Sequence, residues 1–528
     1  MIKVATAAEI KKLDQLATEL FDIPSLILME NAAIGVVDFI SNLSSEKSIS
    51  NVLILSGHGN NGGDGFAIAR HLVNRGYNVC VILIGNPQKI SGDARVNFEI
   101  IQKISEKESN LKIYINPKSL NKIKELFDGP FDLVVDALLG TGLNSEIREP
   151  YLTTIKWANK YKALKLAVDI PTGLSSDNGK ILGIAFQADY TLTMGLPKVG
   201  LLINDGPKVS GKIEIVDISY PFSLSNSDDV KKHLIEEVDI YERLPRRPYD
   251  AHKYSVGKVF AIAGSSGLTG AAKMSCEAAL RSGCGGVLLL TTQKLLSVYA
   301  KSLKEVMTFP LKNNNGNYFV ENDFDEIKSK VEWADVLMIG PGLGQNQETL
   351  KFLRKLLLYY PNKKKVIDAD GLNLLANFID DRKLFLKNSI LTPHLGEFSR
   401  LIRKSVDEIK ENIFEYGEEF ARKHKAILVL KGAPTIIFDP SGNSYINSTG
   451  NSGMATVGMG DVLTGMISSF FAQGLSSLDA AIVGVFLHGL AGDIAAIKKS
   501  KLSLISSDVI KFIPDTIKII EAIDQEHD

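Results

Sequence analysis

Short apolar segments alternate with amphipathic segments along most of the chain. Four apolar segments in the first part carry Gly or Asp at or near their carboxyl ends: NVLILSG, NVCVILIG, DLVVDALLG and KLAVDIPTG. Segments with the periodicity of helices, such as DGFAIARHLVNRG, separate them. Because apolar strands that alternate with amphipathic helices form parallel sheets covered on both faces, the pattern predicts an α/β fold.

A polar, turn-rich segment, SYPFSLSNSDDVKK, interrupts this alternation near residue 220. A second series of apolar segments follows it: KVFAIAGSSG, GGVLLLTT, DVLMIGPGLG, KKVIDADG, SILTPHLGE and AILVLKGAPTIIFD. The chain has 528 residues, enough for two domains of roughly 200 residues or more. We therefore predict two α/β domains, residues 1–222 and residues 230–528, joined by a linker.

The composition is that of a globular protein without a broad charged surface. Its 60 basic and 61 acidic residues leave a net charge of −1, so we expect no nucleic-acid and no membrane partner. Three scattered cysteines without a C-x-x-C pair argue against a disulfide framework and a thiolate zinc site. We find no uninterrupted apolar run long enough to cross a bilayer, and MIKVATAAEIKKLDQLA does not resemble a signal peptide. We expect a cytoplasmic protein.

The most distinctive segment of the first half is SGHGNNGGDGFAIAR, residues 56–70. It contains G-x-G-x-x-G between a predicted strand and a predicted helix, as dinucleotide-dependent dehydrogenases do. Such enzymes also need an acidic residue about 20 positions later, at the end of the second strand. Here NVCVILIGNP has none, and Asp93 lies well beyond it. Asp64 would repel a pyrophosphate, and no Gly-Lys-Ser/Thr follows as in a Walker loop. The segment therefore argues against an ordinary dehydrogenase.

Polar side chains gather instead at three predicted strand ends. Asn60, Asn61 and Asp64 begin a helix, and Asp136 and Asp169 end two later apolar strands. Each alone is typical of a turn or a helix cap. Together at the carboxyl edge of one sheet, where open α/β sheets bind ligands, they favour a site. Carboxylate and amide oxygens without His or Cys suit a hard cation such as K⁺ or Mg²⁺ rather than zinc.

GNNGGDG, DALLGTGL and VDIPTGL resemble, in order and spacing, the three signatures of the YjeF N-terminal family, the NAD(P)H-hydrate epimerases. The resemblance implies a Rossmann-like three-layer sandwich that binds a hydrated nicotinamide dinucleotide as substrate. It also implies a K⁺ ion held by Asn61, Asp136 and Thr172, where many relatives have Ser at position 172. The implied substrate-binding residues are Asn60, Asn61, Gly62, Gly63, Asp64, Gly140, Thr141, Gly142, Leu143, Asn144, Ser145, Glu146 and Asp169.

Epimerisation at C6 of the hydrated ring needs proton transfers, which a carboxylate in a dry pocket can perform. Asp169 is our choice for this acid/base role, and Asp64 is its rival.

In the second half the most informative segment is GMGDVLTG, residues 458–465. Glycines directly before a helix leave backbone N–H groups pointing at one spot, which forms an anion site. Asp461 at the helix start can accept a proton from a hydroxyl that attacks a phosphoryl group. A capped helix with a glycine-rich entry is the alternative. AGSSGLTGAA, GPGLG, TPHLGE and LKGAPT favour a site, because they bring Gly, Pro, Thr and His to the same predicted sheet edge.

These motifs, in this order, resemble the ribokinase-like fold and, within it, the ADP-dependent NAD(P)H-hydrate dehydratases. The resemblance implies a three-layer α/β domain that uses ADP as co-substrate together with Mg²⁺. It implies that Ala271, Gly342 or Gly344, His394 and Asp461 contact the hydrated nucleotide. The implied nucleotide-binding residues are Lys431, Gly432, Ala433, Pro434, Thr435 and Gly460.

Three further positions of this half, His394, Lys431 and Val457, bear on the predicted sites. His394 follows an apolar strand, so we expect it to line the pocket, and no zinc-ligand spacing accompanies it. Lys431 is either a phosphate-neutralising cation or a solvated lysine at a strand end. Relatives read T-G-G-x-G-D, whereas Val457 replaces one of these glycines here, which is a departure beside the nucleotide site.

Together the two resemblances imply a bifunctional repair enzyme. It would interconvert the R and S forms of NADHX and NADPHX and dehydrate the S form to NADH or NADPH, with ADP converted to AMP and phosphate. The implied chemistry is phosphorylation of the C6 hydroxyl, aided by Asp461 and Mg²⁺, and then loss of phosphate.

Two other functions stay open at this point. A kinase of a small molecule, such as a vitamin precursor, with a regulatory N-terminal domain would share the Gly-x-Gly-Asp motif. A non-enzymatic scaffold, a role that YjeF-like domains have in messenger RNA decay, conflicts with the near-neutral charge and the complete set of polar strand ends. The sequence leaves homo-oligomerisation open.

Overall fold

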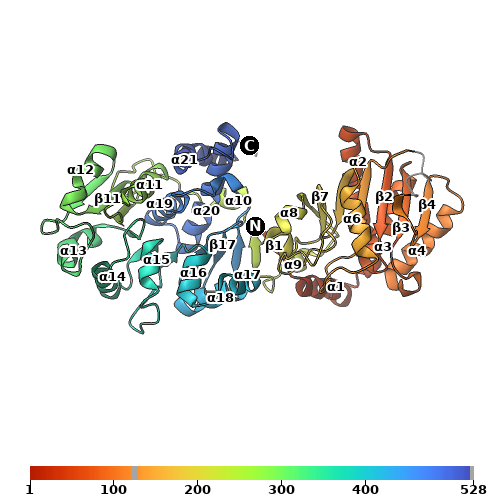
Figure 1. The fold of residues 1–528 in the computed structure, drawn as a ribbon, viewed down its shortest axis with the longest axis horizontal. Coiled ribbons are helices and arrows are strands. Elements are labelled where there is room, and N and C mark those ends of the chain that lie inside the picture. The colour runs from red at the N-terminus through yellow and green to blue at the C-terminus, as the bar shows by residue number, and fades with distance from the viewer. Residues whose placement is uncertain (122–128, 524–528) are drawn as a thin grey trace. The chain divides into compact units, whose positions relative to one another are not determined.

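The computed structural model describes residues 1–121 and 129–523, which form two compact units (Figure 1). The N-terminal unit comprises Lys3–Lys231. The C-terminal unit comprises the residues from Lys232 onward together with Met1 and Ile2. The Met1 ammonium group donates to Oδ1 of Asp239 at 2.6 Å, a contact within the C-terminal unit. The sequence pattern gives no sign that the first two residues belong there.

The N-terminal unit contains a seven-stranded, fully parallel sheet with the order β4-β3-β2-β5-β6-β7-β8. Its strands are β2 (Asn51–Ser56), β3 (Asn78–Leu83), β4 (Leu111–Ile115), β5 (Leu133–Ala137), β6 (Leu164–Val168), β7 (Tyr190–Met194) and β8 (Lys212–Val216). Its helices are α1 (Ala7–Phe21), α2 (Ser25–Lys47), α3 (Asn60–Asn74), α4 (Gly92–Ser105), α6 (Tyr151–Lys160), α7 (Val199–Leu202), α8 (Gly206–Val209), α9 (Phe222–Ser225) and the 3₁₀ turn Pro87–Lys89. The predicted parallel α/β fold is confirmed.

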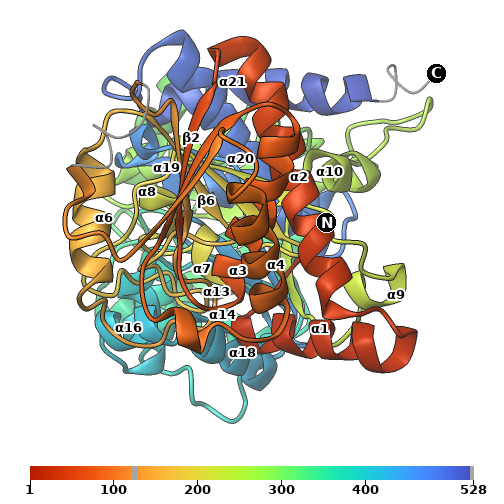
Figure 2. The same cartoon turned by 90° about the vertical axis from the view of Figure 1, so that its right-hand side faces the viewer.

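Alternate residues of each strand pack against the two helical layers. Val52 and Ile54 of β2 belong to the core beneath α2, α3 and α4, whereas Leu53 and Leu55 belong to the core beneath α6. Figure 2 shows α2, α3 and α4 on one side of the strands and α6 on the other. Because both faces are buried, the strands read as continuous apolar runs. The unit is a three-layer sandwich.

The C-terminal unit contains an eleven-stranded sheet with the order β1-β9-β18-β17-β16-β15-β14-β13-β10-β11-β12. The sheet includes β1 (Ile2–Val4), of which only Ile2 belongs to this unit. Its other strands are β9 (Lys232–Leu234), β10 (Lys258–Ile262), β11 (Gly286–Thr291), β12 (Met307–Pro310), β13 (Val336–Ile339), β14 (Lys364–Ile367), β15 (Ser389–Leu391), β16 (Ile427–Leu430), β17 (Ile436–Phe438) and β18 (Ser444–Ile446). Its helices are α10 (Glu237–Arg243), α11 (Thr269–Arg281), α12 (Gln293–Ser302), α13 (Phe324–Trp333), α14 (Gln347–Tyr359), α15 (Asp370–Leu375), α16 (Leu395–Ile402), α17 (Val406–Glu411), α18 (Ile413–His424), α19 (Met459–Ala472), α20 (Ser477–Lys498) and α21 (Ser506–Glu521), with 3₁₀ turns Glu321–Asp323 and Ser452–Met454.

Two layers of helices cover this sheet. α19 packs on β10, β13 and β14, and α20 packs on β15 and β16. Figure 1 shows α13, α14, α15 and α16 along the opposite face. The strands from β12 to β16 are parallel, but β16, β17 and β18 pair antiparallel. The alternating pattern does not predict this antiparallel extension, because AILVLKGAPTIIFD folds as a hairpin of β16 and β17 without an intervening helix.

Two helices, α2 and α20, are long and apolar enough, by length and composition, to cross a membrane. In α20, 72% of the most apolar window is buried inside the structure, and in α2 the share is 44%. The core helices of globular proteins share this length and composition. Neither helix is an uninterrupted apolar run, because α2 contains Glu30 and Asp38 and α20 contains His488 and Asp493.

Candidate active sites at the carboxyl edges of the two sheets

In the N-terminal unit the three polar motifs follow adjacent strands. β2, β5 and β6 are neighbours in the sheet, and the strand order reverses between β2 and β5. At such a reversal the loops diverge and leave a crevice where ligands bind. The loops approach closely, because Gly57 N–H donates to the Ala137 carbonyl at 3.0 Å. A Cβ on Gly57 would lie 1.9 Å from the Leu138 carbonyl oxygen, so only glycine fits there.

Asp136 and Thr172 form the buried centre of this edge. Asp136 is fully buried and accepts hydrogen bonds from the backbone N–H groups of Thr172 (2.8 Å) and Leu138 (3.2 Å). The Thr172 hydroxyl lies 2.8 Å from Asp136 Oδ1. Burial raises the pKa of Asp136 to about 6, and these hydrogen bonds oppose only part of that rise. No Lys, Arg or His is paired with Asp136 among the described residues.

Asn61 stands in the first turn of α3 and contacts the second motif. A Cβ on Gly140 would lie 3.3 Å from Asn61 Cβ and 3.8 Å from its Oδ1. The Asn61 side chain is 8% exposed, and neither its oxygen nor its nitrogen has a hydrogen-bond partner in the described structure. A buried amide left unpaired costs free energy, so the Asn61 side chain is a candidate ligand-binding group.

The other predicted residues of this edge surround that centre. Gly62 and Gly63 are buried in the first turns of α3, where Asn60 is exposed and Asp64 partly exposed. A Cβ on Gly62 would lie 2.0 Å from the Gly57 carbonyl oxygen, which explains that glycine. Most of the loop that follows β5 is exposed, and its residues are Gly140, Thr141, Gly142, Leu143, Asn144, Ser145 and Glu146.

Asp169 has a partner that the sequence does not reveal. Its side chain forms an ion pair with Lys198, which is 1% exposed, and its Oδ1 also accepts from the Met194 N–H at 3.1 Å. Asp169 has a φ of 68°, in the left-handed region. Asp14 of α1 belongs to the same charged group, because its charge and those of Lys198 and Asp169 act on Asp64.

Asp64 itself has no side-chain hydrogen bond among the described residues. Burial and the charge of Asp169 raise the pKa of Asp64 well above its ordinary value. Asp14 raises it further, and Lys198 opposes the rise.

In the C-terminal unit a lysine and an aspartate occupy the corresponding edge. Lys431 follows β16, and its ammonium donates to Oδ1 of Asp368, the residue after β14, at 2.6 Å. The Thr464 hydroxyl of α19 donates to the other oxygen of Asp368 at 2.6 Å. Glu397 lies 3.9 Å from the Lys431 ammonium. Burial alone would lower the pKa of Lys431, but Asp368 and Glu397 raise it above its ordinary value, so the lysine is charged.

Asp461 lies in the first turn of α19 beside this pair. α19 begins after Gly458, whose φ is 94°, and its cap forms no side-chain hydrogen bond. Burial raises the pKa of Asp461 to about 7; Asp368 adds to the rise and Lys431 opposes it. Gly460 faces the lysine, because a Cβ there would lie 3.1 Å from Lys431 Nζ. A carboxylate of this pKa is half-ionised at neutral pH, which suits a group that accepts a proton.

The three small residues predicted to contact substrate lie together. A Cβ on Gly342 would lie 3.1 Å from the Cβ of Ala271, and one on Gly344 would lie 3.3 Å from Ser265 Oγ. The Gly344 N–H donates to Asp370 at 2.9 Å, and the charge of Asp370 also acts on Asp461. The glycine loop after β13 is therefore connected to the Asp461 region.

Ala369, between Asp368 and Asp370, has φ 49° and ψ −122°. Glycine is the usual residue in this region of conformational space. The backbone at this point is strained.

His394 has a structural contact that the sequence analysis does not anticipate. Its Nδ1 accepts the backbone N–H groups of Gly396 (3.0 Å) and Glu397 (3.3 Å), so His394 caps α16. The ring is 55% exposed, and the His394 backbone pairs with that of Lys431. His394 therefore lies beside the charged group and holds the start of α16.

The proposed nucleotide segment forms the turn of the β16–β17 hairpin. Gly432 and Ala433 are exposed, Pro434 and Thr435 partly buried, and Lys431 at its start points to Asp368. Val457 is 92% exposed and is not among the residues with positive φ. Its backbone does not require glycine, so the departure from T-G-G-x-G-D leaves the local chain conformation intact.

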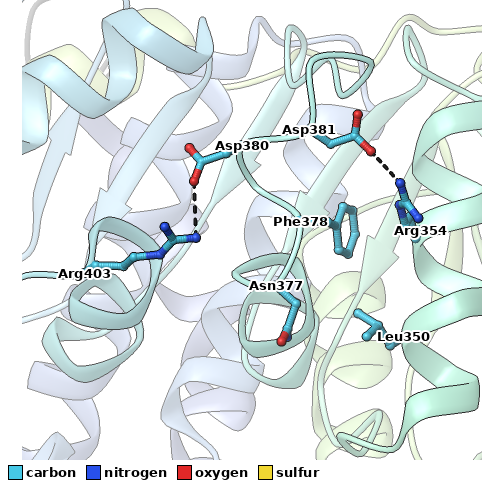
Figure 3. A pocket seen from close by; sticks show the side chains of 7 residues that line it. All are labelled: Leu350, Arg354, Asn377, Phe378, Asp380, Asp381 and Arg403. Atoms are coloured by element: carbon cyan, nitrogen blue, oxygen red, sulfur yellow. Dashed lines mark hydrogen bonds and ion pairs between the residues drawn. The ribbon is translucent and has the colours of Figure 1, made fainter.

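A separate cavity of about 460 Å³ lies among α14, α15 and α16 (Figure 3). Arg354 pairs with Asp381 at 2.8 Å and Arg403 with Asp380 at 3.3 Å across it, with Phe378 between them. None of its lining residues belongs to the predicted sites. Because each arginine already faces a carboxylate, the cavity has little excess charge with which to bind an anion.

The two halves of the chain match two family models. They are described as YjeF-related protein N-terminus, over residues 25–200, and NAD(P)H-hydrate dehydratase, over residues 259–515. The bifunctional NAD(P)H-hydrate repair enzyme of Moorella thermoacetica is 39% identical over 525 residues, which cover 98% of this chain and 97% of the relative. The enzyme of that name from Thermofilum pendens is 36% identical over 522 residues, with coverage of 98% and 97%. The chain belongs to this repair-enzyme family.

A solved structure was also found for the C-terminal half. It is the ADP/ATP-dependent NAD(P)H-hydrate dehydratase from Bacillus subtilis co-crystallised with ATP and Mg²⁺, at 27% identity and a TM-score of 0.47, covering 55% of this chain and 99% of that chain. The resemblance to the repair-enzyme family inferred from the motifs is confirmed by the full-length relatives.

Both family models span the groups of charged residues described above. Residues 25–200 include Asp136, Asp169 and Lys198, and residues 259–515 include Lys431 and Asp461. Of the charged residues in these groups that lie within the two ranges, the sequence analysis did not single out Lys198, Asp368, Asp370 and Glu397. A signal existed for two of them, because Lys198 interrupts the apolar run GLPKVGLL and Asp368 directly ends the strand KKVI.

Proposed function

We propose that the chain repairs hydrated nicotinamide nucleotides at two separate sites. The N-terminal site interconverts the R and S forms of NADHX and NADPHX. The C-terminal site dehydrates the S form to NADH or NADPH while ADP is converted to AMP and phosphate. The observation that carries this proposal is the presence, in one member of the repair-enzyme family, of two acidic sheet edges whose carboxylates have raised pKa values.

We propose that Asn61, Asp136 and Thr172 hold a K⁺ ion in the N-terminal site. The unpaired buried amide of Asn61 fits a ligand role, and Asp136 is a buried carboxylate with no cationic partner among the described side chains. Oxygen ligands with a single negative charge suit a monovalent hard cation. The ion would supply positive charge that anchors the loop after β5 and the substrate at this edge.

In the same site Asp64 and Asp169 lie within electrostatic range of one another. Moving a hydroxyl from one face of C6 to the other requires one group that gives a proton and takes it back. The glycine-rich start of α3 and the loop Gly140–Glu146 would bind the rest of the nucleotide.

In the C-terminal site Asp461 acts as the base. It takes the proton of the C6 hydroxyl, the hydroxyl oxygen attacks the β-phosphorus of ADP, and the bond to the AMP oxygen breaks. The backbone N–H groups at the start of α19 stabilise the negative charge that develops. The phosphate group then leaves C6 with the bonding electrons, and loss of a C5 proton restores the ring double bond.

Mg²⁺ would act here through the nucleotide. Among the described residues, no group of three or more His, Cys, Asp or Glu side chains is arranged to hold a metal ion. Mg²⁺ commonly binds through substrate phosphates and one or two carboxylates, so this site needs no dedicated protein cage. The ion would neutralise phosphate charge during transfer.

We also propose a cytoplasmic location. The cysteines Cys80, Cys276 and Cys284 are buried and free, as in proteins of reducing compartments.

The deciding experiment gives the full chain a mixture of R- and S-NADHX, with ADP, with ATP or with no nucleotide. Return of the absorbance of reduced nicotinamide from both forms, only when nucleotide is present, is the expected result. Conversion of no more than the S form would contradict the epimerase assignment. Consumption of nucleotide without return of reduced nicotinamide, and with phosphorylation of another small molecule, would support the kinase alternative.

A further inference from the structure

The environment of Lys198 is unusual for a lysine. It is 1% exposed and follows β7, the strand next to β6 in the sheet. Its ammonium donates to Asp169, to the Met194 carbonyl at 2.8 Å and, at 3.3 Å, to the Thr193 hydroxyl. All three protons of the ammonium therefore have acceptors. Burying an ammonium group is costly unless it is paired and hydrogen-bonded, and Asp169 provides the only carboxylate paired with it among the described residues.

The pairing occupies one side of Asp169. The Lys198 ammonium and the Met194 N–H both bind Oδ1, and Oδ2 has no hydrogen bond or ion pair within the described structure. Asp169 is 14% exposed, and its φ of 68° turns the backbone at the end of β6. The ion pair and the Met194 hydrogen bond hold this side chain in a fixed orientation, with its second oxygen available at the sheet edge.

Asp64 lacks such a partner. No hydrogen bond or ion pair of its side chain occurs among the described residues, although Asp169, Lys198 and Asp14 all act on it electrostatically. Asp14 is itself engaged, because it accepts a hydrogen bond from the Tyr220 hydroxyl. Burial and the charge of Asp169 raise the pKa of Asp64, so it retains its proton where an ordinary aspartate would not. The edge thus holds one aspartate fixed by an ion pair and one aspartate without a hydrogen-bond partner among the described residues.

We propose that Lys198 is a positioning residue for epimerisation, which fixes Asp169 as the carboxylate and thereby leaves Asp64 as the acid that exchanges a proton with the C6 hydroxyl. This inference rests on the proposed epimerase activity of the same edge and divides the work between the two rival aspartates.

In the proposed step, Asp64 gives its proton to the C6 hydroxyl. The C6–O bond then breaks, its electron pair leaves with the water molecule, and the lone pair of the ring nitrogen forms a C6=N1 double bond. The resulting cation is stabilised by the Asp169 carboxylate. Water then adds to the opposite face of C6, the π electrons return to N1, and the proton released by that water returns to Asp64.

The test measures conversion of pure R-NADHX to the S form by chromatography, across a range of pH, with the full chain and without ADP so that dehydration is silent. In Lys198→Met the Asp169 side chain loses its counter-charge and the ion pair that fixes its orientation. We expect the rate at neutral pH to fall about 100-fold and the low-pH limb of the profile to move up by about one unit or more. A merely structural role would lower the rate equally at every pH.

Lys365→Met is the matched control. Lys365 is also 1% exposed, but it lies in the C-terminal unit, and its ammonium contacts only the Pro361 carbonyl in the described structure. Its loss should leave both the epimerisation rate and the pH profile unchanged. In a Trp333→Phe background, fluorescence of Trp157 reports whether the N-terminal unit of each variant is folded.

Asp64→Asn provides a second test that leaves the Lys198–Asp169 ion pair in place. We expect a loss of about 100-fold or more, because the amide cannot donate the acid proton. A folded Lys198→Met variant with the profile of the unaltered protein, or an Asp64→Asn variant with its full rate, would overturn the inference. Absence of epimerisation in the unaltered protein would instead overturn the proposed function, and the inference with it.

Discussion

Each unit places a lysine beside an aspartate at the carboxyl edge of its sheet, but the two lysines differ in their other contacts. Lys198 is 1% exposed, and its remaining protons go to a backbone carbonyl and a threonine hydroxyl. Lys431 is 18% exposed and has a second carboxylate, Glu397, at 3.9 Å. Lys198 is therefore paired with one carboxylate, that of Asp169, whereas Lys431 lies near those of both Asp368 and Glu397.

The two lysines also leave different aspartates without a cation beside them. In the N-terminal unit the lysine is paired with Asp169, and Asp64 is left without a partner. In the C-terminal unit the lysine is paired with Asp368, and Asp461 is left with a pKa of about 7. In both sites the pKa of an aspartate that does not touch the lysine, Asp64 or Asp461, is raised.

The largest expected effect concerns Asp461 in the C-terminal unit. Asp461→Asn should reduce ADP-dependent dehydration by about two to four orders of magnitude, the usual contribution of a positioned base. ADP binding, measured by calorimetry, should persist, because the amide is isosteric and the backbone N–H groups remain. Epimerisation by the same sample is the control. Near-normal dehydration would leave Asp461 as a residue of the helix start only.

The next prediction concerns the paired lysine. Lys431→Met leaves Asp368, which is 1% exposed, without its cation, and should lower the free energy of unfolding of the C-terminal unit by about 3 kcal/mol. The chain has two tryptophans, Trp157 and Trp333, one in each unit. In a Trp157→Phe background, urea unfolding followed by fluorescence therefore reports the C-terminal unit alone. A change below about 1 kcal/mol would mean that solvent or Thr464 satisfies Asp368 without the lysine.

The pH dependence of dehydration tests the role of Asp461 in a second way. A base works only when ionised, and the raised pKa of Asp461 means that it holds its proton below about pH 7. The rate should therefore rise about tenfold per pH unit below that value and level off above it. Asp370→Asn removes a negative charge that raises this pKa, so the midpoint should move to lower pH. A midpoint that does not move would show that another group controls the profile.

The smallest effect concerns the proposed cation in the N-terminal unit. At a K⁺ concentration ten times the dissociation constant, binding should stabilise this unit by about 1.4 kcal/mol. Thermal unfolding followed by Trp157 fluorescence, in a Trp333→Phe background, measures the shift against Na⁺. Asp136→Asn removes the only anionic ligand of the proposed set and should abolish the K⁺ effect. Equal stabilisation of both proteins would argue against this site.

The sequence predicts those features that local pattern determines. Apolar runs ending in Gly or Asp locate β2, β5 and β6, and the parallel alternation brings Asn61, Asp136 and Asp169 to one edge without knowledge of the coordinates. The glycine-rich start of α19 likewise marks Asp461. These signals work because strand ends and helix starts in a parallel sheet lie at the same edge.

Features that depend on long-range packing are not accessible in this way. Lys198 meets Asp169 across 29 positions, and Lys431 meets Asp368 across 63. The sequence predicts that His394 lines the pocket. The structure adds that its ring nitrogen caps α16, a role that only the side-chain geometry reveals. Similarly, Met1 and Ile2 belong to the C-terminal unit, and a short terminal segment carries no pattern that indicates its partner.

The conformation of Ala369 has a consequence for engineering this protein. Exchange for glycine would relieve strain of about 1–3 kcal/mol but would add about 0.5–1 kcal/mol of unfolded-chain entropy. A thermostability screen would therefore favour the exchange. The same backbone bend turns Asp368 toward the lysine and Asp370 toward Gly344. A glycine at position 369 would hold the Asp368 and Asp370 carboxylates less rigidly. Selection for heat resistance and selection for turnover should therefore oppose each other at this single residue.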